Sequence, residues 1–125
     1  MTMAGLVSKN FDKADETRPF GGGKGRLDLV ETDGGAVGRG VFEPGWKWSE
    51  HIKPIAGTES CESAHTGYVV SGRMKIVMDD GDSLEIGTGD FIQVAPGHDA
   101  WVLGDEPCVV LDWTGYGRYA KPVSG

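Results

Sequence analysis

Hydrophobic and polar residues alternate along short segments of this chain, which is the pattern of half-buried β-strands. In the segment 73–78, Met74, Ile76 and Met78 recur at every second position. Strands of the same kind are expected at residues 26–30, 36–42, 46–51 and 108–113. The stretch 65–101 consists of further short β-type runs, and no segment of any length has a helical period.

Turn residues separate these runs at close intervals. Asp80-Gly81 lies between two of them, and Asp and Gly adopt the positive φ angles of a two-residue hairpin turn. Further chain reversals are expected at Ser71-Gly72, at Gly87–Gly89 and at Pro96-Gly97. The glycines at 72, 81 and 97 are predicted to have positive φ or close-packed positions. Many short strands at this spacing predict an all-β sandwich or barrel.

The chain has 125 residues, the length of one domain. Residues 1–25 are polar, end in a glycine-rich run and are expected to form a loosely ordered arm. The barrel is predicted to span 26–114, and 115–125 to form a C-terminal tail. Within the barrel, the segment 52–63 has no clear period, and we expect it to be a loop that covers the mouth of a pocket.

Charge and composition exclude several classes of partner. The net charge of −7 argues against binding to nucleic acid or to an anionic membrane surface. No run approaches the 18 apolar residues of a membrane-spanning helix. Two cysteines far apart in sequence, without a signal peptide, predict reduced thiols and a cytoplasmic protein.

Two spaced patterns carry a family resemblance. Pro44-Gly45 is followed after five residues by His51, and His65 stands six residues before Gly72. Further along, Gly89-Asp90 precedes Pro96-Gly97. In turns, strand pattern and spacing, residues 41–113 resemble the cupin superfamily, whose members are small jelly-roll barrels of the double-stranded β-helix type.

The resemblance implies a metal site, but the chain departs from the family's usual ligands. Lys53 stands where the family has a second histidine, and His65 stands where it has a glutamate. Ala100 takes the place of the final histidine. His98 is two residues earlier, so in an extended strand its side chain would point the same way as that of Ala100.

The metal ligands expected from this resemblance are His51, His65, His98 and Cys61. The three histidines are expected to converge inside the barrel mouth, with Cys61 and Lys53 at its rim. Three imidazoles, or two imidazoles and a thiolate, would suit Zn²⁺ with one open position. Fe, Mn, Ni and Cu are the other transition metals that the resemblance implies, and no organic cofactor is expected.

Each of these residues also has a structural interpretation. His51 would be solvated beside Glu50, His65 would hydrogen-bond to backbone at a strand start, and His98 would belong to a turn. Cys61 would be a plain loop thiol. If the segment 46–51 is extended, its two tryptophans face away from His51 and pack in the core or against a second subunit.

Three functions remain open at this stage. The first is a small-molecule enzyme of oxygenase, isomerase or lyase type, with His51, His65 and His98 as its catalytic residues. The second is a non-catalytic ligand-binding or sensor module, and the third is a metal-free structural barrel. The fold does not decide whether the protein is an enzyme. A homodimer is predicted, because the sheet edges of a small barrel need protection.

Overall fold

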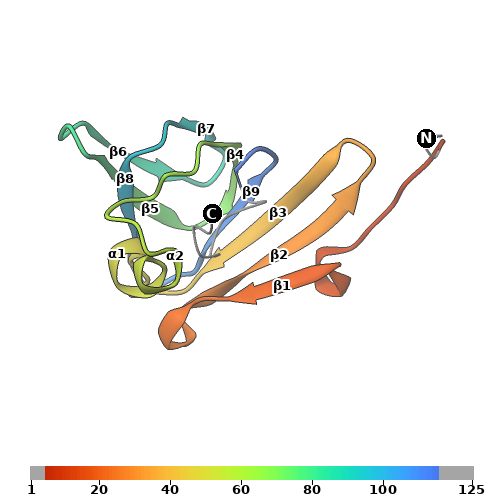
Figure 1. Ribbon diagram of the computed structural model, residues 1–125, viewed down its shortest axis with the longest axis horizontal. Coiled ribbons are helices and arrows are strands. Elements are labelled where there is room, and N and C mark those ends of the chain that lie inside the picture. Colours follow the sequence, from red (N-terminus) through yellow and green to blue (C-terminus); the bar gives the residue numbers. More distant parts are fainter. Residues whose placement is uncertain (1–4, 116–125) are drawn as a thin grey trace.

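The computed structural model describes residues 5–115 (Figure 1). Strands dominate, and the helical elements are single turns. In chain order the elements are η1 (Phe11–Lys13), β1 (Glu16–Pro19), η2 (Gly21–Gly23), β2 (Gly25–Thr32), β3 (Gly35–Phe42), α1 (Trp48–His51), α2 (Lys53–Ala56), β4 (His65–Ser71), β5 (Arg73–Met78), β6 (Ser83–Gly87), β7 (Phe91–Val94), β8 (His98–Leu103) and β9 (Cys108–Asp112).

The strands form two antiparallel sheets. The larger has the order β1-β2-β3-β9-β4-β7, and the smaller has the order β6-β5-β8. Figure 1 shows β4 to β9 gathered into a barrel, from which β1, β2 and β3 extend as a long ribbon. Side chains from both sheets fill the barrel, among them Val69, Ile76, Val102 and Val110, all buried. The predicted all-β jelly-roll fold is confirmed.

The turn predictions are confirmed as well. Gly72, Gly81 and Gly97 all have positive φ. Between β5 and β6 the backbone N–H of Gly81 donates to the carbonyl of Met78, and Met78 N–H donates to the carbonyl of Asp82. The connection is therefore a three-residue turn rather than the expected two-residue one.

The segment 46–56 differs from expectation, because the predicted strand and loop contain two helical turns. Trp48 and Ile52 are four residues apart, so one turn of helix buries both side chains on the same side, where they are 2% and 1% exposed. Pro54 lies in the first turn of α2, where its missing N–H costs no hydrogen bond, and Gly57 caps the end.

The N-terminal segment also differs from the expected loose arm. Residues Glu16 to Pro19 pair with β2 as the outermost strand of the larger sheet. Phe20 is buried and stacks on Phe42 with a distance of 5.3 Å between ring centroids. The expected C-terminal tail lies, apart from its first residue, outside the described residues. Within residues 5–115 no helix is long and apolar enough to span a membrane.

Candidate metal centre

Two histidines and one cysteine meet at one end of the barrel. His65 begins β4 and His98 begins β8, in opposite sheets. Cys61 precedes β4 and bridges to β8, since its N–H donates to the carbonyl of His98 and its carbonyl accepts from Gly97 N–H. This bridge holds the thiol beside the two imidazoles.

The three side chains are close enough to share one ligand. The Sγ of Cys61 lies 3.7 Å from the Nε2 of His65. The rings of His65 and His98 have centroids 5.3 Å apart. One donor atom from each of the three residues lies within 4.8 Å of the others, and all three residues are buried. We call Cys61, His65 and His98 the Cys/His/His cluster.

Each imidazole is oriented by a hydrogen bond at its other nitrogen. The Nδ1–H of His65 donates to the Asp112 carboxylate at 2.5 Å, and the Nδ1–H of His98 donates to the carbonyl of Ala95 at 2.8 Å. The Nε2 atom of each ring is therefore the one left to serve the cluster. A carboxylate or carbonyl behind a histidine in this way is the usual support of a metal-ligating imidazole.

Asp112 is the functional residue that the sequence analysis missed. It ends β9, is 1% exposed, and its second carboxylate oxygen accepts from the N–H groups of Thr114 and Gly115. A signal was present in the strand pattern: in β9 the inward-facing positions are Cys108, Val110 and Asp112. A carboxylate in the inward phase of a core strand needs a buried partner.

The pKa values of Cys61, His65 and Asp112 are shifted by their close contacts. Burial opposes ionisation of Cys61, but hydrogen bonds from His65 and His98 outweigh it and lower the pKa of the thiol to about 6. Burial likewise disfavours the imidazolium of His65, yet the hydrogen bonds to Asp112 and Cys61 raise its pKa to about 9. The pKa of Asp112 is lowered against its burial, chiefly by His65.

By contrast, Cys108 has no such neighbours. It is buried, and burial alone raises the pKa of its thiol to about 12. The two cysteines of the chain therefore differ in ionisation. The thiolate of Cys61 is favoured by its neighbours, whereas Cys108 is a core side chain whose thiol stays protonated.

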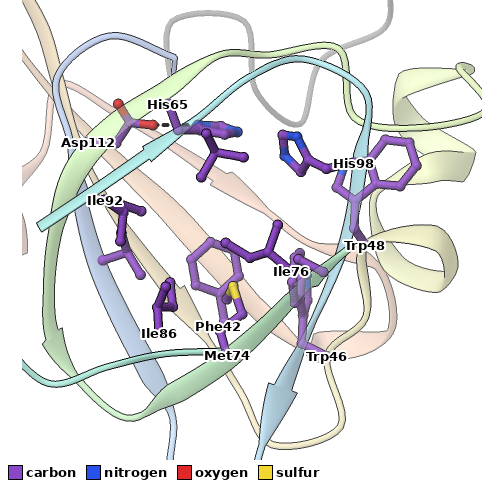
Figure 2. A pocket seen from close by; sticks show the side chains of 13 residues that line it. Phe42, Trp46, Trp48, His65, Met74, Ile76, Ile86, Ile92, His98 and Asp112 are labelled. Atoms are coloured by element: carbon purple, nitrogen blue, oxygen red, sulfur yellow. Dashed lines mark hydrogen bonds and ion pairs between the residues drawn. The ribbon is translucent and has the colours of Figure 1, made fainter. Parts of the chain in front are cut away.

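A cavity of about 40 Å³ adjoins the cluster, with His65, His98 and Asp112 on its wall (Figure 2). That is room for roughly three water-sized groups. The rest of the wall is apolar and includes Phe42, Met74, Ile86 and Ile92.

Trp46, on the wall of this cavity, carries one buried polar atom without a partner among the described residues. The residue lines the cavity and is 2% exposed, and its Nε1–H has no hydrogen-bond acceptor among the described residues. A buried donor without an acceptor costs free energy, so a water or a ligand oxygen inside the cavity is the expected partner.

His51 does not join the other two histidines. It ends α1, its Nδ1 lies 3.0 Å from the backbone N of Lys47, and its ring lies beside Gly22. It is absent from both the cluster and the cavity wall. The physical reason is the helical turn, which directs the side chain back onto its own backbone and the N-terminal segment instead of into the barrel.

One further expectation about this end of the barrel needs correction, and one open alternative is decided. Cys61 is buried at 3% exposure rather than placed at a rim, whereas Lys53 is outside and pairs with Glu59. Of the two positions expected for Trp46 and Trp48, the structure shows the core, since both are 2% exposed, and not a contact with a second subunit.

The residues of the cluster fit a transition metal. One thiolate and two imidazoles with anchored Nδ1–H groups would supply three ligands of the type that Zn²⁺ takes in catalytic sites. The adjoining cavity would leave room for a further ligand. The apolar wall would keep bulk water away from that ligand.

Several solved structures share the fold. The polyketide cyclase RemF from Streptomyces resistomycificus matches with a TM-score of 0.62 at 19% identity, over 88% of this chain and 79% of that one. A double-stranded β-helix protein from Klebsiella pneumoniae matches with a TM-score of 0.56 at 21% identity, over 93% of each chain.

Oxalate decarboxylase from Lactobacillus farciminis, solved with formate, matches with a TM-score of 0.56 at 18% identity. The match covers 91% of this chain but 35% of the decarboxylase. At these identities the likeness shows the fold alone, and no curated protein matches the sequence. The family model described as "Cupin domain" matches residues 44–114. That match spans more than half of the sequence, and the chain therefore belongs to the cupin family.

Proposed function

We propose that this cupin is a metal-dependent enzyme that acts on a small molecule bound in the barrel cavity. The observation that carries the proposal is the orientation of the cluster. His65 and His98 each donate Nδ1–H to a fixed acceptor, so both Nε2 atoms and the Cys61 thiolate are available to one ion. Zn²⁺ is one metal that takes a thiolate and two imidazoles and keeps an open fourth position.

The metal would supply Lewis-acid activation of a substrate oxygen or of a bound water. The chain's own residues would do the rest. Asp112 holds the proton on Nδ1 of His65 and so fixes the tautomer that ligates. The Nε1–H of Trp46 is free to donate to a ligand oxygen, and the apolar wall excludes water.

The donor set also bears on the reaction type. Zn²⁺ has no redox chemistry, so a zinc site here would support a lyase or isomerase reaction over an oxygenase reaction. Two of the structural neighbours are a polyketide cyclase and an oxalate decarboxylase, which supports a reactive pocket in this cupin. Catalytic roles are proposed here for His65 and His98, and none for His51.

Cobalt substitution tests the proposal directly. Protein stripped with a chelator and loaded with Co²⁺ should show an intense thiolate-to-cobalt charge-transfer absorption at one equivalent of metal. Cys61→Ser should lose this absorption, because the thiolate is its source. Cys108→Ala is the matched control and should keep it, because Cys108 lies outside the cluster. Loss in both variants, or in neither, would contradict the assignment.

The partner and the location of the protein belong to the same proposal. We infer a homodimer and a reducing, cytoplasmic environment. Cys61 and Cys108 are both free thiols, and the proposed ligand role requires Cys61 to stay reduced.

A further inference from the structure

The side chains that line the cavity beside the cluster are nearly all buried. Each of the thirteen residues that line it is at most 9% exposed. A ligand that enters the cavity has to pass between these nearly buried side chains. Val94, at 9%, is the most exposed of the thirteen.

A second hollow lies directly outside this wall. It is a groove of about 240 Å³ between the β5–β6 hairpin and the end of β7. Met78 and Leu84 make its walls apolar, and its polar residues are Asp82, Ser83 and Gln93. No cation lines it among the described residues.

The groove and the cavity share two wall residues, Ile76 and Val94. Figure 2 shows Ile76 reaching into the cavity near His98. The groove also includes Ala95, whose carbonyl accepts the Nδ1–H of His98. Ile76 and Val94 therefore stand between the larger hollow and the cavity that adjoins the Cys/His/His cluster.

We propose that the groove is the outer compartment of the ligand site, and that Ile76 and Val94 form the gate between it and the cavity. The ligand class follows from the two volumes, and here the inference rests on the proposed metal site. The cavity accommodates a small metal-binding head such as a carboxylate. The groove accommodates a narrow, uncharged apolar part of the same ligand. Its walls are apolar, and its polar residues are one aspartate and two neutral side chains.

The gate is testable without any metal. In metal-free protein carrying Cys108→Ala, Cys61 is the one thiol left, and its alkylation by iodoacetamide reports access to the cluster. Val94→Ala should speed alkylation about tenfold, because it opens the shared wall. Val110→Ala removes the same atoms from a wall that faces the cavity but not the groove, and it should leave the rate within about twofold.

If Cys61 is alkylated at equal rates in Val94→Ala and Val110→Ala, and the two variants melt at the same temperature, the proposed gate would be refuted. This experiment does not depend on the metal, so its failure is distinguishable from failure of the proposed function. If Cys61 is alkylated slowly in Val94→Ala while the cobalt spectrum is normal, the metal centre would still be supported and the proposed entry route would be refuted.

The ligand class has its own test on cobalt-loaded protein. Acetate offers a carboxylate with a single methyl group, whereas hexanoate joins the same carboxylate to a longer alkyl chain. Hexanoate should perturb the cobalt absorption at a concentration about tenfold lower than acetate, because its methylenes leave water in the groove. Leu84→Trp, which fills the groove from an exposed position, should abolish that advantage.

Val70→Trp is the matched control, since Val70 is similarly exposed but lines neither hollow. It should keep the advantage of hexanoate. Equal binding of the two acids to the parent protein, or an unchanged advantage in Leu84→Trp, would refute the outer compartment.

Discussion

Asp112 is the residue on which the order of the cluster depends. One carboxylate oxygen accepts from His65, and the other accepts from the backbone of Thr114 and Gly115. The carboxylate is thus held on both sides and cannot rotate away from the imidazole. Through its hydrogen bond to Nδ1 it acts as a positioning residue for His65.

Replacing this carboxylate should weaken metal binding. Asp112→Asn keeps the shape but removes the charge that fixes the Nδ1–H of His65, so we expect a loss of about 10–100-fold in Zn²⁺ affinity. Competition with a chromophoric chelator measures it. Asp99→Asn is the control, because the Asp99 carboxylate accepts from Ser49 and Ala100 instead. Equal losses in both variants would show a general charge effect and contradict the role of Asp112.

The pKa of Cys61 predicts how the metal-free protein responds to pH. Alkylation needs the thiolate, and a pKa lowered from 9.0 to about 6 keeps Cys61 ionised above that pH. In protein carrying Cys108→Ala, the rate should therefore rise with pH and level off above about 6. His65→Asn removes the main stabilising hydrogen bond, so the midpoint should move upward. A midpoint that stays in place would exclude His65 as the cause.

At the scale of the elements, single helical turns and tight connections between strands determine where several side chains of the site lie. The bridge between Cys61 and β8 brings the thiol to His98, and α1 places Trp48 in the cavity wall while directing His51 away. The β4–β5 and β5–β6 turns both use a glycine with positive φ, but in different surroundings.

Valine substitution separates the two turns. At Gly81, φ is +98° and no atom lies within 4 Å of an added Cβ. Gly81→Val should therefore cost only the backbone strain, about 1–2 kcal/mol. At Gly72, φ is +82° and an added Cβ would lie 2.3 Å from the carbonyl oxygen of Pro107. Gly72→Val should cost about 3 kcal/mol or more.

Urea unfolding of the two variants measures the difference. If Gly72→Val were no more destabilising than Gly81→Val, the close approach of β9 to the β4–β5 turn would be refuted. An unchanged midpoint for Gly81→Val would reject the positive φ at that turn.

At the scale of the whole molecule, apolar side chains remain uncovered on the outer face of β9, β4 and β7. Phe91 is 65% exposed, Trp113 45% and Tyr68 41%. The rings of Phe91 and Trp113 lie 6.4 Å apart, and Tyr68 is paired with Phe91 across the strands. This face, rather than Trp46 and Trp48, offers apolar area to a second copy.

The predicted homodimer should therefore depend on this face. Light scattering should give twice the monomer mass of 13.3 kDa, and Phe91→Glu should shift it toward the monomer. Leu84→Glu, an equally drastic change at a 54% exposed position of the other sheet, should leave the dimer intact. A monomer in the parent protein, or equal dissociation in both variants, would contradict the prediction.

Alternation and turn residues sufficed to predict the jelly roll, since both are read from near neighbours in the chain. The inward phase of His98 with Ala100 follows in the same way, and the structure buries both. These are local properties, so the sequence by itself determines them.

The composition of the site required contacts that are distant in sequence. Asp112 and His65 are 47 positions apart, and their hydrogen bond depends on β9 lying beside β4. His51 was assigned to the site by its spacing from Pro44-Gly45, but α1 uses those residues as a helical turn. Only the tertiary structure decided the site, because burial and strand pairing determine which side chains share a cavity.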